Sequence, residues 1–349
     1  MGLLRGRERG PSYDALVKEF VEACQDKFGH NVLIQFEDFG NQNAFRLLQE
    51  YQDKACTFND DIQGTGAVAV AGLVASTRLT GKDLSDHTFL FLGAGEAAIG
   101  IADLITYKIS LESNVSLEEA RTKIFLVDSK GLVTKARLDG LQRHKVLYAH
   151  EVTHDCPNLL SAVEYLKPTC LIGVSAQPKM FTKEILEKMT EWSDHPIIFA
   201  LSNPTSKAEC TAKEAYEFTN GKAIFSGGSP FAPVTLKDGS LRVPGQGNNV
   251  YIFPGVGLGV LATGSSKVTN HDMLIAAECL AAQVTQEQLD IGCVYPPLSE
   301  IRNVSSAIAL AVAENAYATG VATRPRPDDL LAYIKSIMYN PFDTCPSSD

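Results

Sequence analysis

Two pairs of adjacent carboxylates lie close together in the first part of the chain. Glu37 and Asp38 follow one short apolar run, and Asp60 and Asp61 follow a second one. Carboxylates are costly to bury unless they are paired, hydrogen-bonded or bound to a metal. Oxygen ligands with little histidine or cysteine nearby favour Mg²⁺ or Mn²⁺ over zinc. The two pairs therefore predict a site for a hard divalent cation.

We predict that Glu37, Asp38 and Asp61 are the metal ligands. On an extended backbone Asp60 points to the opposite side from Asp61, so we expect it to orient a neighbouring group instead. Helix capping combined with surface charge is the competing interpretation of these carboxylates.

A glycine-rich turn follows the apolar segment 88–92 and precedes a helical pattern, and it comprises Gly93, Ala94, Gly95, Glu96, Ala97 and Ala98. Between a strand and a helix, this spacing is typical of a dinucleotide site. Gly93 permits the tight turn, and Gly95 lets the backbone approach a pyrophosphate at the helix N-terminus. The third glycine position is Ala98, an accepted small variant. A plain glycine-rich turn is the alternative.

The next predicted strand ends in Asp128, Ser129 and Lys130. An acidic residue there would bind a ribose 2′-hydroxyl and favour NAD, although it comes later than the usual ~20 residues after the turn. Ser129, Lys130 and the downstream Lys145 suit a 2′-phosphate instead. The residues leave NAD and NADP open, and a solvated surface position is the alternative for each lysine.

Polar residues also follow later segments of the chain. Asn203 comes directly after an apolar run, and Asn248 and Asn249 follow a glycine. At the carboxyl ends of parallel strands these amides would reach a cofactor or a substrate carboxylate. Simple turn formation is the alternative for all three.

Bulk properties narrow the class of protein. The chain has 349 residues and a net charge of −10, so a nucleic-acid partner is not expected. No apolar run approaches the ~20 residues that span a bilayer, so we expect no membrane partner. The eight cysteines are scattered without metal-like spacing, which indicates free thiols in a reducing compartment.

Apolar runs alternate with helical patterns through most of the chain. We predict strands at 31–36, 88–92, 123–127, 170–174, 196–201 and 223–226, and helices at 12–27, 41–51, 67–79, 152–165, 183–190, 213–218, 257–264, 273–284, 307–318 and 330–338. The order predicts an α/β fold with a doubly wound, parallel, Rossmann-like sheet and flanking helical segments. We expect a metal-domain remnant at 1–60, a nucleotide-binding domain at 61–248, a helical segment at 249–320 and a tail at 321–349.

Six segments in order resemble the malic enzymes far more specifically than any single motif. They are residues 33–39, 56–65, 93–100, 127–132, 199–210 and 244–249. The resemblance implies oxidative decarboxylation of L-malate to pyruvate and CO₂ with reduction of NADP⁺, or less favourably NAD⁺. It implies that Glu37, Asp38 and Asp61 hold Mn²⁺ or Mg²⁺ and that Asp60 contacts the catalytic base. Asn203, Asn248 and Asn249 would line the pocket for malate and nicotinamide.

The resemblance begins after the part of the family pattern that carries a tyrosine acid, a lysine base and a substrate-binding arginine. We therefore expect a truncated chain that lacks turnover by itself, or else a catalytically silent NAD(P)- and metal-binding module that associates with full-length subunits. Another metal-dependent 2-hydroxy-acid dehydrogenase is a third possibility. The family implies a homodimer or homotetramer in the cytoplasm or in an organelle matrix, with any targeting region outside this chain.

Overall fold

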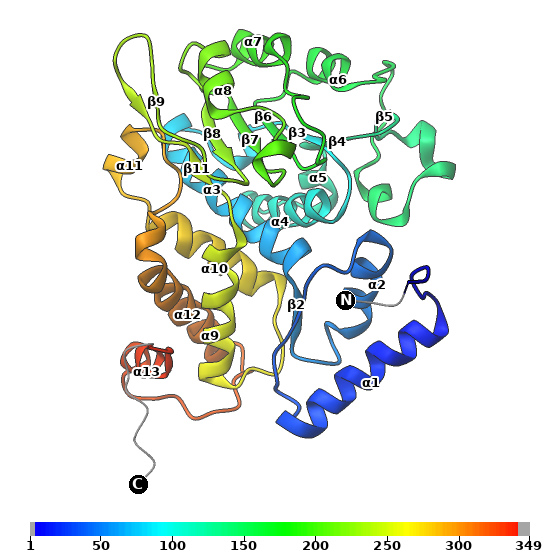
Figure 1. The fold of residues 1–349 in the computed structure, drawn as a ribbon, viewed down its shortest axis with the longest axis vertical. Helices are drawn as coiled ribbons and strands as arrows, with labels where there is room; N and C mark the ends of the chain where they lie inside the picture. Colours follow the sequence, from blue (N-terminus) through cyan, green and yellow to red (C-terminus); the bar gives the residue numbers. More distant parts are fainter. Residues whose placement is uncertain (1–3, 341–349) are drawn as a thin grey trace.

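The computed structural model describes residues 4–340, and a seven-stranded sheet lies in the upper half of the view in Figure 1. The five apolar segments predicted between residues 88 and 226 form parallel strands, as expected. A two-residue strand extends each edge, and the one beside β4 is antiparallel. The sheet order is β11 (Gly245–Gln246), β8 (Ile224–Gly227), β7 (Ile197–Ala200), β6 (Cys170–Gly173), β3 (Phe89–Leu92), β4 (Ile124–Asp128) and β5 (Gly131–Leu132).

Helices cover both faces of the sheet. Successive strand residues point to opposite sides, so each strand contributes apolar side chains to both faces. Phe89 and Phe91 of β3 pack toward one set of helices, and Leu90 and Leu92 pack toward the other. The first set includes α3 (Thr65–Thr80), α4 (Glu96–Ser113) and α10 (Asn270–Ala282). The second consists of α6 (Leu159–Leu166), α7 (Lys183–Trp192) and α8 (Ala212–Phe218). This double cover explains the nearly continuous apolar strands.

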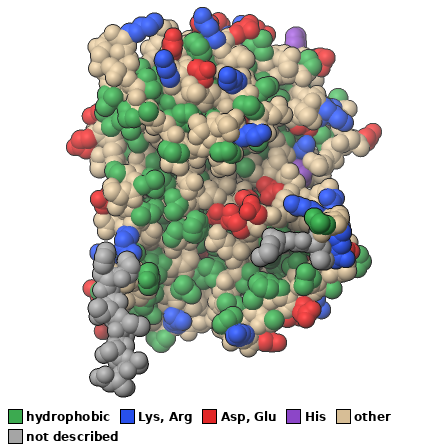
Figure 2. All heavy atoms as spheres, viewed as in Figure 1, with side chains coloured by type: hydrophobic (Ala, Val, Ile, Leu, Met, Phe, Trp, Pro, Cys, Tyr) green, Lys and Arg blue, Asp and Glu red, His purple; other side chains and the backbone are tan. Residues whose placement is uncertain are grey.

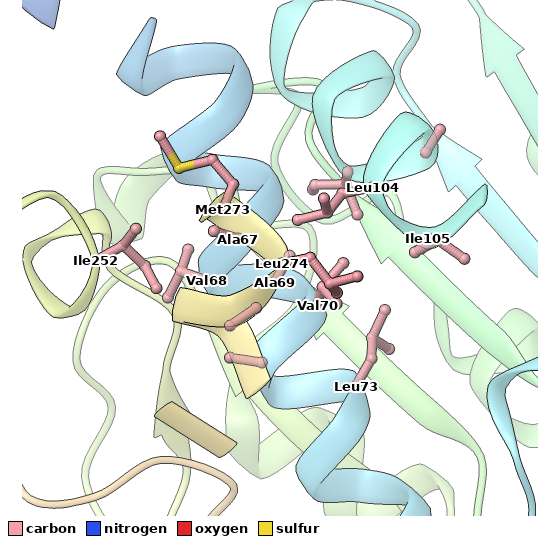
Figure 3. Packing of buried hydrophobic residues seen from close by; sticks show 14 of the residues in the cluster. Ala67, Val68, Ala69, Val70, Leu73, Leu104, Ile105, Ile252, Met273 and Leu274 are labelled. Atoms are coloured by element: carbon pink, nitrogen blue, oxygen red, sulfur yellow. The ribbon is translucent and has the colours of Figure 1, made fainter. Parts of the chain in front are cut away.

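Helix α3 is buried on most sides, as its alanine- and valine-rich sequence predicts. Figure 3 shows Ala67 and Val70 of α3 among Leu274 of α10 and Leu104 of α4. A Cβ atom added at Gly66 would lie 2.7 Å from the carbonyl oxygen of Gly100, so the two helices approach through glycine. The close crossing holds the N-terminal end of α4 against the turn that precedes α3.

The N-terminal unit lies beside this assembly, at the lower right of Figure 1. It consists of α1 (Pro11–Phe28), β1 (Ile34–Phe36), α2 (Asn41–Tyr51) and β2 (Thr57–Asn59), and it has an apolar cluster of its own. Strands β1 and β2 are parallel, and Phe36 is opposite Asn59. Both carboxylate pairs follow directly, so parallel pairing brings them to the same edge.

Three further helices pack together at the lower left of Figure 1. A satellite apolar cluster joins α9 (Phe253–Thr263), α12 (Ile301–Ala318) and α13 (Leu330–Ile337). The short helices α5 (Leu117–Arg121) and α11 (Gln286–Asp290) lie in connections, and β9 (Val234–Thr235) and β10 (Leu241–Arg242) form a hairpin. No helix in the part that the structure describes has the length and apolar content to cross a bilayer.

Two of the sequence expectations that differ from the structure have a clear local cause. The helix predicted at 152–165 begins only at Leu159, because Asn158 caps it in a capping box with Ser161 and Pro157 precedes the cap. The backbone at Asp60 is not extended, because residues Asp60–Gly64 form a single π-helical turn between β2 and α3. Asp60 and Asp61 therefore diverge through helical geometry and not through strand alternation.

Candidate active site

Three carboxylates converge where β1 and β2 end. One oxygen each from Glu37, Asp38 and Asp61 lies within 4.8 Å of the others. Asp38 has a left-handed backbone with φ of 59°, and its N–H donates to Asp61 Oδ2 at 2.8 Å. Burial, together with repulsion from Asp61 and Asp38, raises the pKa of Glu37, whereas a bond from Gln35 lowers it. Figure 2 shows acidic side chains gathered near the middle of this face.

The chemistry of this carboxylate trio, Glu37, Asp38 and Asp61, fits a divalent cation. Like charges at this separation destabilise one another, and a hard cation would offset the repulsion. No ion pair is found for any member of the trio among the described residues. The trio could therefore hold Mg²⁺ or Mn²⁺, which remains a prediction.

Asp60 lies behind the trio and is buried. Its Oδ2 accepts from Asn249 Nδ2 at 2.8 Å, and its main-chain oxygen accepts from the same nitrogen at 3.1 Å. The other carboxylate oxygen has no hydrogen-bond partner in the described structure. Burial, followed by repulsion from Glu37 and Asp61, raises the pKa of Asp60 to about 7. Asp60 is thus placed to fix Asn249, which sequence reasoning had not paired with it.

The glycine-rich turn presents the N-terminus of α4 to the same region. Gly93 has φ of 121°, and a Cβ atom there would lie 2.8 Å from the carbonyl oxygen of Val174. The N–H of Glu96, in the first turn of α4, donates to Asn41 Oδ1 at 2.9 Å. Asn41 begins α2 and was missed by sequence reasoning. Its amide oxygen shows that this helix N-terminus accepts an electronegative group.

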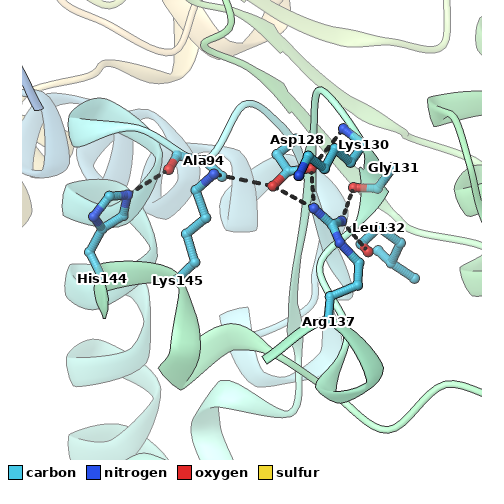
Figure 4. A network of polar contacts seen from close by, with 8 residues as sticks. All are labelled: Ala94, Asp128, Lys130, Gly131, Leu132, Arg137, His144 and Lys145. Carbon is cyan, nitrogen blue, oxygen red and sulfur yellow. Dashed lines mark hydrogen bonds and ion pairs between the residues drawn. The ribbon is translucent and has the colours of Figure 1, made fainter. Parts of the chain in front are cut away.

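His144 supports the back of the turn (Figure 4). Its Nε2 lies 3.2 Å from the carbonyl oxygen of Ala94, and its ring stacks on Phe45 of α2 at 4.5 Å between centroids. Burial lowers the pKa of His144. The imidazole thus joins α2, the turn and the 3₁₀ segment Arg143–Tyr148, which also carries Lys145.

Asp128 ends β4 and is enclosed by cations (Figure 4). Arg137 donates to both carboxylate oxygens, at 2.7 and 2.9 Å, and Lys145 Nζ lies 3.1 Å from Oδ2. Burial alone would raise the pKa of Asp128, but bonds from Arg137, the Lys130 N–H and Lys145 hold it below its usual value. Ser129 and Lys130 are exposed beside it. Sequence reasoning missed Arg137, whose position depends on the 3₁₀ segment Lys135–Gly140.

One cavity of ≈ 740 Å³ brings most of the predicted residues together. Among the described residues its lining includes no lysine and no tyrosine. The predicted site residues that line it are Glu37, Asp38, Asp60, Asp61, Gly95, Glu96, Ala97, Asn203, Asn248 and Asn249. Burial, then repulsion from Asp61 and Asp38, raises the pKa of Glu96 to about 7.

The other predicted residues lie outside the lining of this cavity. Gly93 and Ala94 belong to the turn behind it, and Ala98, in the first turn of α4, is fully buried against the apolar core. Asp128, Ser129, Lys130 and Lys145 gather at the end of the neighbouring strand β4. The predicted site therefore has two ends, which are joined by the glycine-rich turn. The trio and the three asparagine amides form one end, and the basic residues around Asp128 form the other, cationic end.

Comparison with known proteins gives consistent matches over nearly the whole chain. A family model described as the NAD binding domain of malic enzyme matches residues 62–317, and one described as the malic enzyme N-terminal domain matches residues 1–52. The chloroplastic NADP-dependent malic enzyme of Flaveria pringlei is 51% identical over 343 residues, which cover 98% of this chain and 53% of that protein. The NADP-dependent malic enzyme of Rattus norvegicus is 53% identical over 97% of this chain and 59% of its own length.

Solved structures show the same fold. A crystal structure of the Entamoeba histolytica malic enzyme matches with a TM-score of 0.72 and 24% identity, over 93% of this chain and 61% of that one. The NAD-dependent malic enzyme of Thermotoga maritima matches with a TM-score of 0.68 and 24% identity, over 87% and 72% respectively. The chain spans between about half and three-fifths of the length of the curated relatives that it matches.

Proposed function

Because the chain belongs to the malic enzyme family, we propose that it carries the metal- and nucleotide-binding parts of an oxidative L-malate decarboxylase that reduces NADP⁺. The names of the NADP-dependent relatives support this proposal. The observation that carries it is the carboxylate trio, which shares one cavity with the N-terminus of α4. The products would be pyruvate and CO₂.

In this proposal Glu37, Asp38 and Asp61 hold Mn²⁺ or Mg²⁺. A divalent ion held there supplies Lewis-acid polarisation of the substrate oxygen at C2. Asp60 keeps the amide of Asn249 in place, and the amides of Asn203 and Asn248 face the same cavity. These amides would bind the substrate carboxylate or the nicotinamide carboxamide.

The cofactor would extend from this cavity to Asp128. Its pyrophosphate would accept from the N–H groups at the start of α4, in the position that Asn41 Oδ1 takes in the structure. Both oxygens of Asp128 already accept from Arg137 or Lys145, so a ribose hydroxyl would have to compete with cations. The single carboxylate of Asp128 lies beside three basic residues, Arg137, Lys145 and Lys130, so this end of the site has a net positive charge. A positive charge here favours a 2′-phosphate and hence NADP⁺ over NAD⁺.

One observation favours a second candidate, an NADP- and metal-binding module without turnover that associates with full-length subunits. Oxidative decarboxylation needs a base for the 2-hydroxyl and an acid for C3 of the enol product. Among the described residues, lysine and tyrosine are missing from the cavity lining. Such a module would bind both ligands in this cavity and leave proton transfer to another subunit.

The experiment that separates the candidates is Mn²⁺-dependent reduction of NADP⁺ by L-malate, with NADP⁺ binding measured on the same sample. Turnover that forms NADPH, with pyruvate and CO₂ as the only products of malate, supports the enzyme and excludes another 2-hydroxy-acid dehydrogenase. Binding without turnover supports the module. Absence of both binding and turnover contradicts the proposal. Light scattering on the same sample tests the expected dimer or tetramer.

A further inference from the structure

Glu209 is a fully buried carboxylate between the ends of β6 and β7. Its residue exposure is 0%, and it contributes no atom to the cavity lining. Oε1 accepts from the N–H of Ser175 at 3.2 Å and from Ser202 Oγ at 2.5 Å. Oε2 accepts from the N–H of Ser202 at 3.4 Å. A buried carboxylate is retained only where donors converge on it, and here all of them come from two loops.

The hydroxyl of Ser202 connects Glu209 to a third backbone group, the N–H of Ala176. While it donates to Glu209, its oxygen accepts from the N–H of Ala176 at 2.8 Å. Ala176 has φ of 55°, a left-handed conformation that is costly for a residue with a side chain. The chain from Glu209 through Ser202 therefore holds a backbone conformation that Ala176 would not favour by itself.

Strand β6 is shaped to admit this carboxylate. A Cβ atom added at Gly173 would lie 2.4 Å from the Cδ atom of Glu209. Gly173 therefore leaves the space through which the carboxylate reaches both loops. Burial raises the pKa of Glu209, and the bonds from Ser202 and Ser175 oppose that rise.

The two loops that Glu209 joins form part of the cavity wall. Val174 and Ala176 line the cavity from the end of β6, and Ser202 and Asn203 line it from the end of β7. The carbonyl of Val174 also lies against Gly93 of the glycine-rich turn. Asp128 and Lys145 lie at the other end of the predicted site and make no contact with this group.

We propose that Glu209 is a positioning residue for the nicotinamide end of the cofactor, acting through Ser202 to fix the loops that carry Ala176 and Asn203. This inference rests on the proposed function, in which a dinucleotide lies between the glycine-rich turn and the cavity. It predicts that loss of the Glu209 restraint affects the nicotinamide end and leaves the adenosine end unchanged.

The test compares two probes on the chain as it exists. NADPH has both ends of the cofactor, whereas adenosine 2′,5′-bisphosphate has only the end expected at Asp128 and Lys145. Glu209→Gln keeps the side-chain shape but places an NH₂ group, a hydrogen-bond donor, where one carboxylate oxygen accepts a hydrogen bond. We expect NADPH affinity to fall about tenfold, with the affinity for the bisphosphate unchanged. Ser202→Ala should act in the same direction, and Glu217→Gln, on the exposed side of α8, is the matched control.

Each outcome decides between a positioning role and a structural one. Parallel losses for both probes would show that Glu209 only stabilises the fold, and no loss for NADPH would show that the loops do not depend on it. If Glu209→Gln does not fold, Ser202→Ala decides, because it keeps the buried carboxylate. Failure of the unsubstituted chain to bind either probe would instead overturn the proposed function and, with it, this inference.

Discussion

Two acidic groups at strand ends have the same chemistry but opposite surroundings. Among the described residues, the trio of Glu37, Asp38 and Asp61 forms no ion pair with a protein cation, and repulsion contributes to the raised pKa of Glu37. Asp128 lies between Arg137 and Lys145, and its pKa is lowered. The carboxylate of Asp128 is neutralised within the fold and orients Arg137 and Lys145. In the described part of the chain the charges of the trio are not paired in this way, so a bound cation would relieve their repulsion.

The largest expected effect tests the trio directly. Asp61→Asn removes one charged ligand and should weaken Mn²⁺ binding by about 100-fold or more, because two carboxylates would remain. Isothermal titration with Mn²⁺ measures this. Asp53→Asn, which changes an exposed carboxylate in the turn after α2, is the control and should leave the affinity unchanged. An Asp61→Asn chain that binds Mn²⁺ as tightly as the original would refute the ligand assignment.

The cationic end should show a cofactor preference. Lys130→Ala combined with Lys145→Ala should weaken NADP⁺ binding about 10- to 100-fold and weaken NAD⁺ binding much less, because only NADP⁺ has a 2′-phosphate. Parallel titrations with the two cofactors measure the difference. Equal losses for both would remove the 2′-phosphate argument, and Lys135→Ala, an exposed lysine, serves as control.

A smaller effect concerns stability at Asp128. Asp128→Asn leaves Arg137 and Lys145 facing each other without a carboxylate. This change should lower the free energy of unfolding by about 1–2 kcal/mol, a value that already allows for the partial exposure of the three side chains. Urea unfolding measures the change. A stability equal to that of the parent chain would mean that this carboxylate does not offset its cations.

The smallest effect has the opposite sign. With metal chelated, Asp61→Asn should raise the free energy of unfolding by a few tenths of a kcal/mol, because one of three mutually repelling charges is lost. The same urea measurement in excess chelator detects this. If Asp61→Asn and Asp128→Asn destabilise the metal-free chain equally, the contrast between the two acidic groups is wrong.

Much of this architecture could be predicted from short-range patterns. The carboxylate pairs stood out because each follows a buried apolar run, and parallel pairing of β1 and β2 then brings them together. The turn at Gly93 was readable from its place between strand and helix. The predicted roles of these residues in metal and cofactor binding remain predictions.

What the sequence did not reveal depends on tertiary contacts. Arg137 reaches Asp128 because a 3₁₀ segment folds back on the end of β4, and Asn41 reaches Glu96 because the start of α2 lies against the N-terminus of α4. No periodicity in the sequence encodes either contact. The sequence analysis did not single out Glu209, and only the structure shows its burial. By contrast, the error in the helix at 152–165 was avoidable, because Asn158 and Ser161 have the spacing of a capping box.

The central claim is that one site brings a metal at the trio next to the nicotinamide end of NADP⁺, with the adenosine end at Asp128. The most direct measurement is the paramagnetic effect of bound Mn²⁺ on the proton resonances of bound NADP⁺. We predict strong broadening of nicotinamide protons, much weaker broadening of adenine protons, and loss of both effects in Asp61→Asn. Equal broadening of the two ring systems, or none while both ligands are bound, would contradict the account.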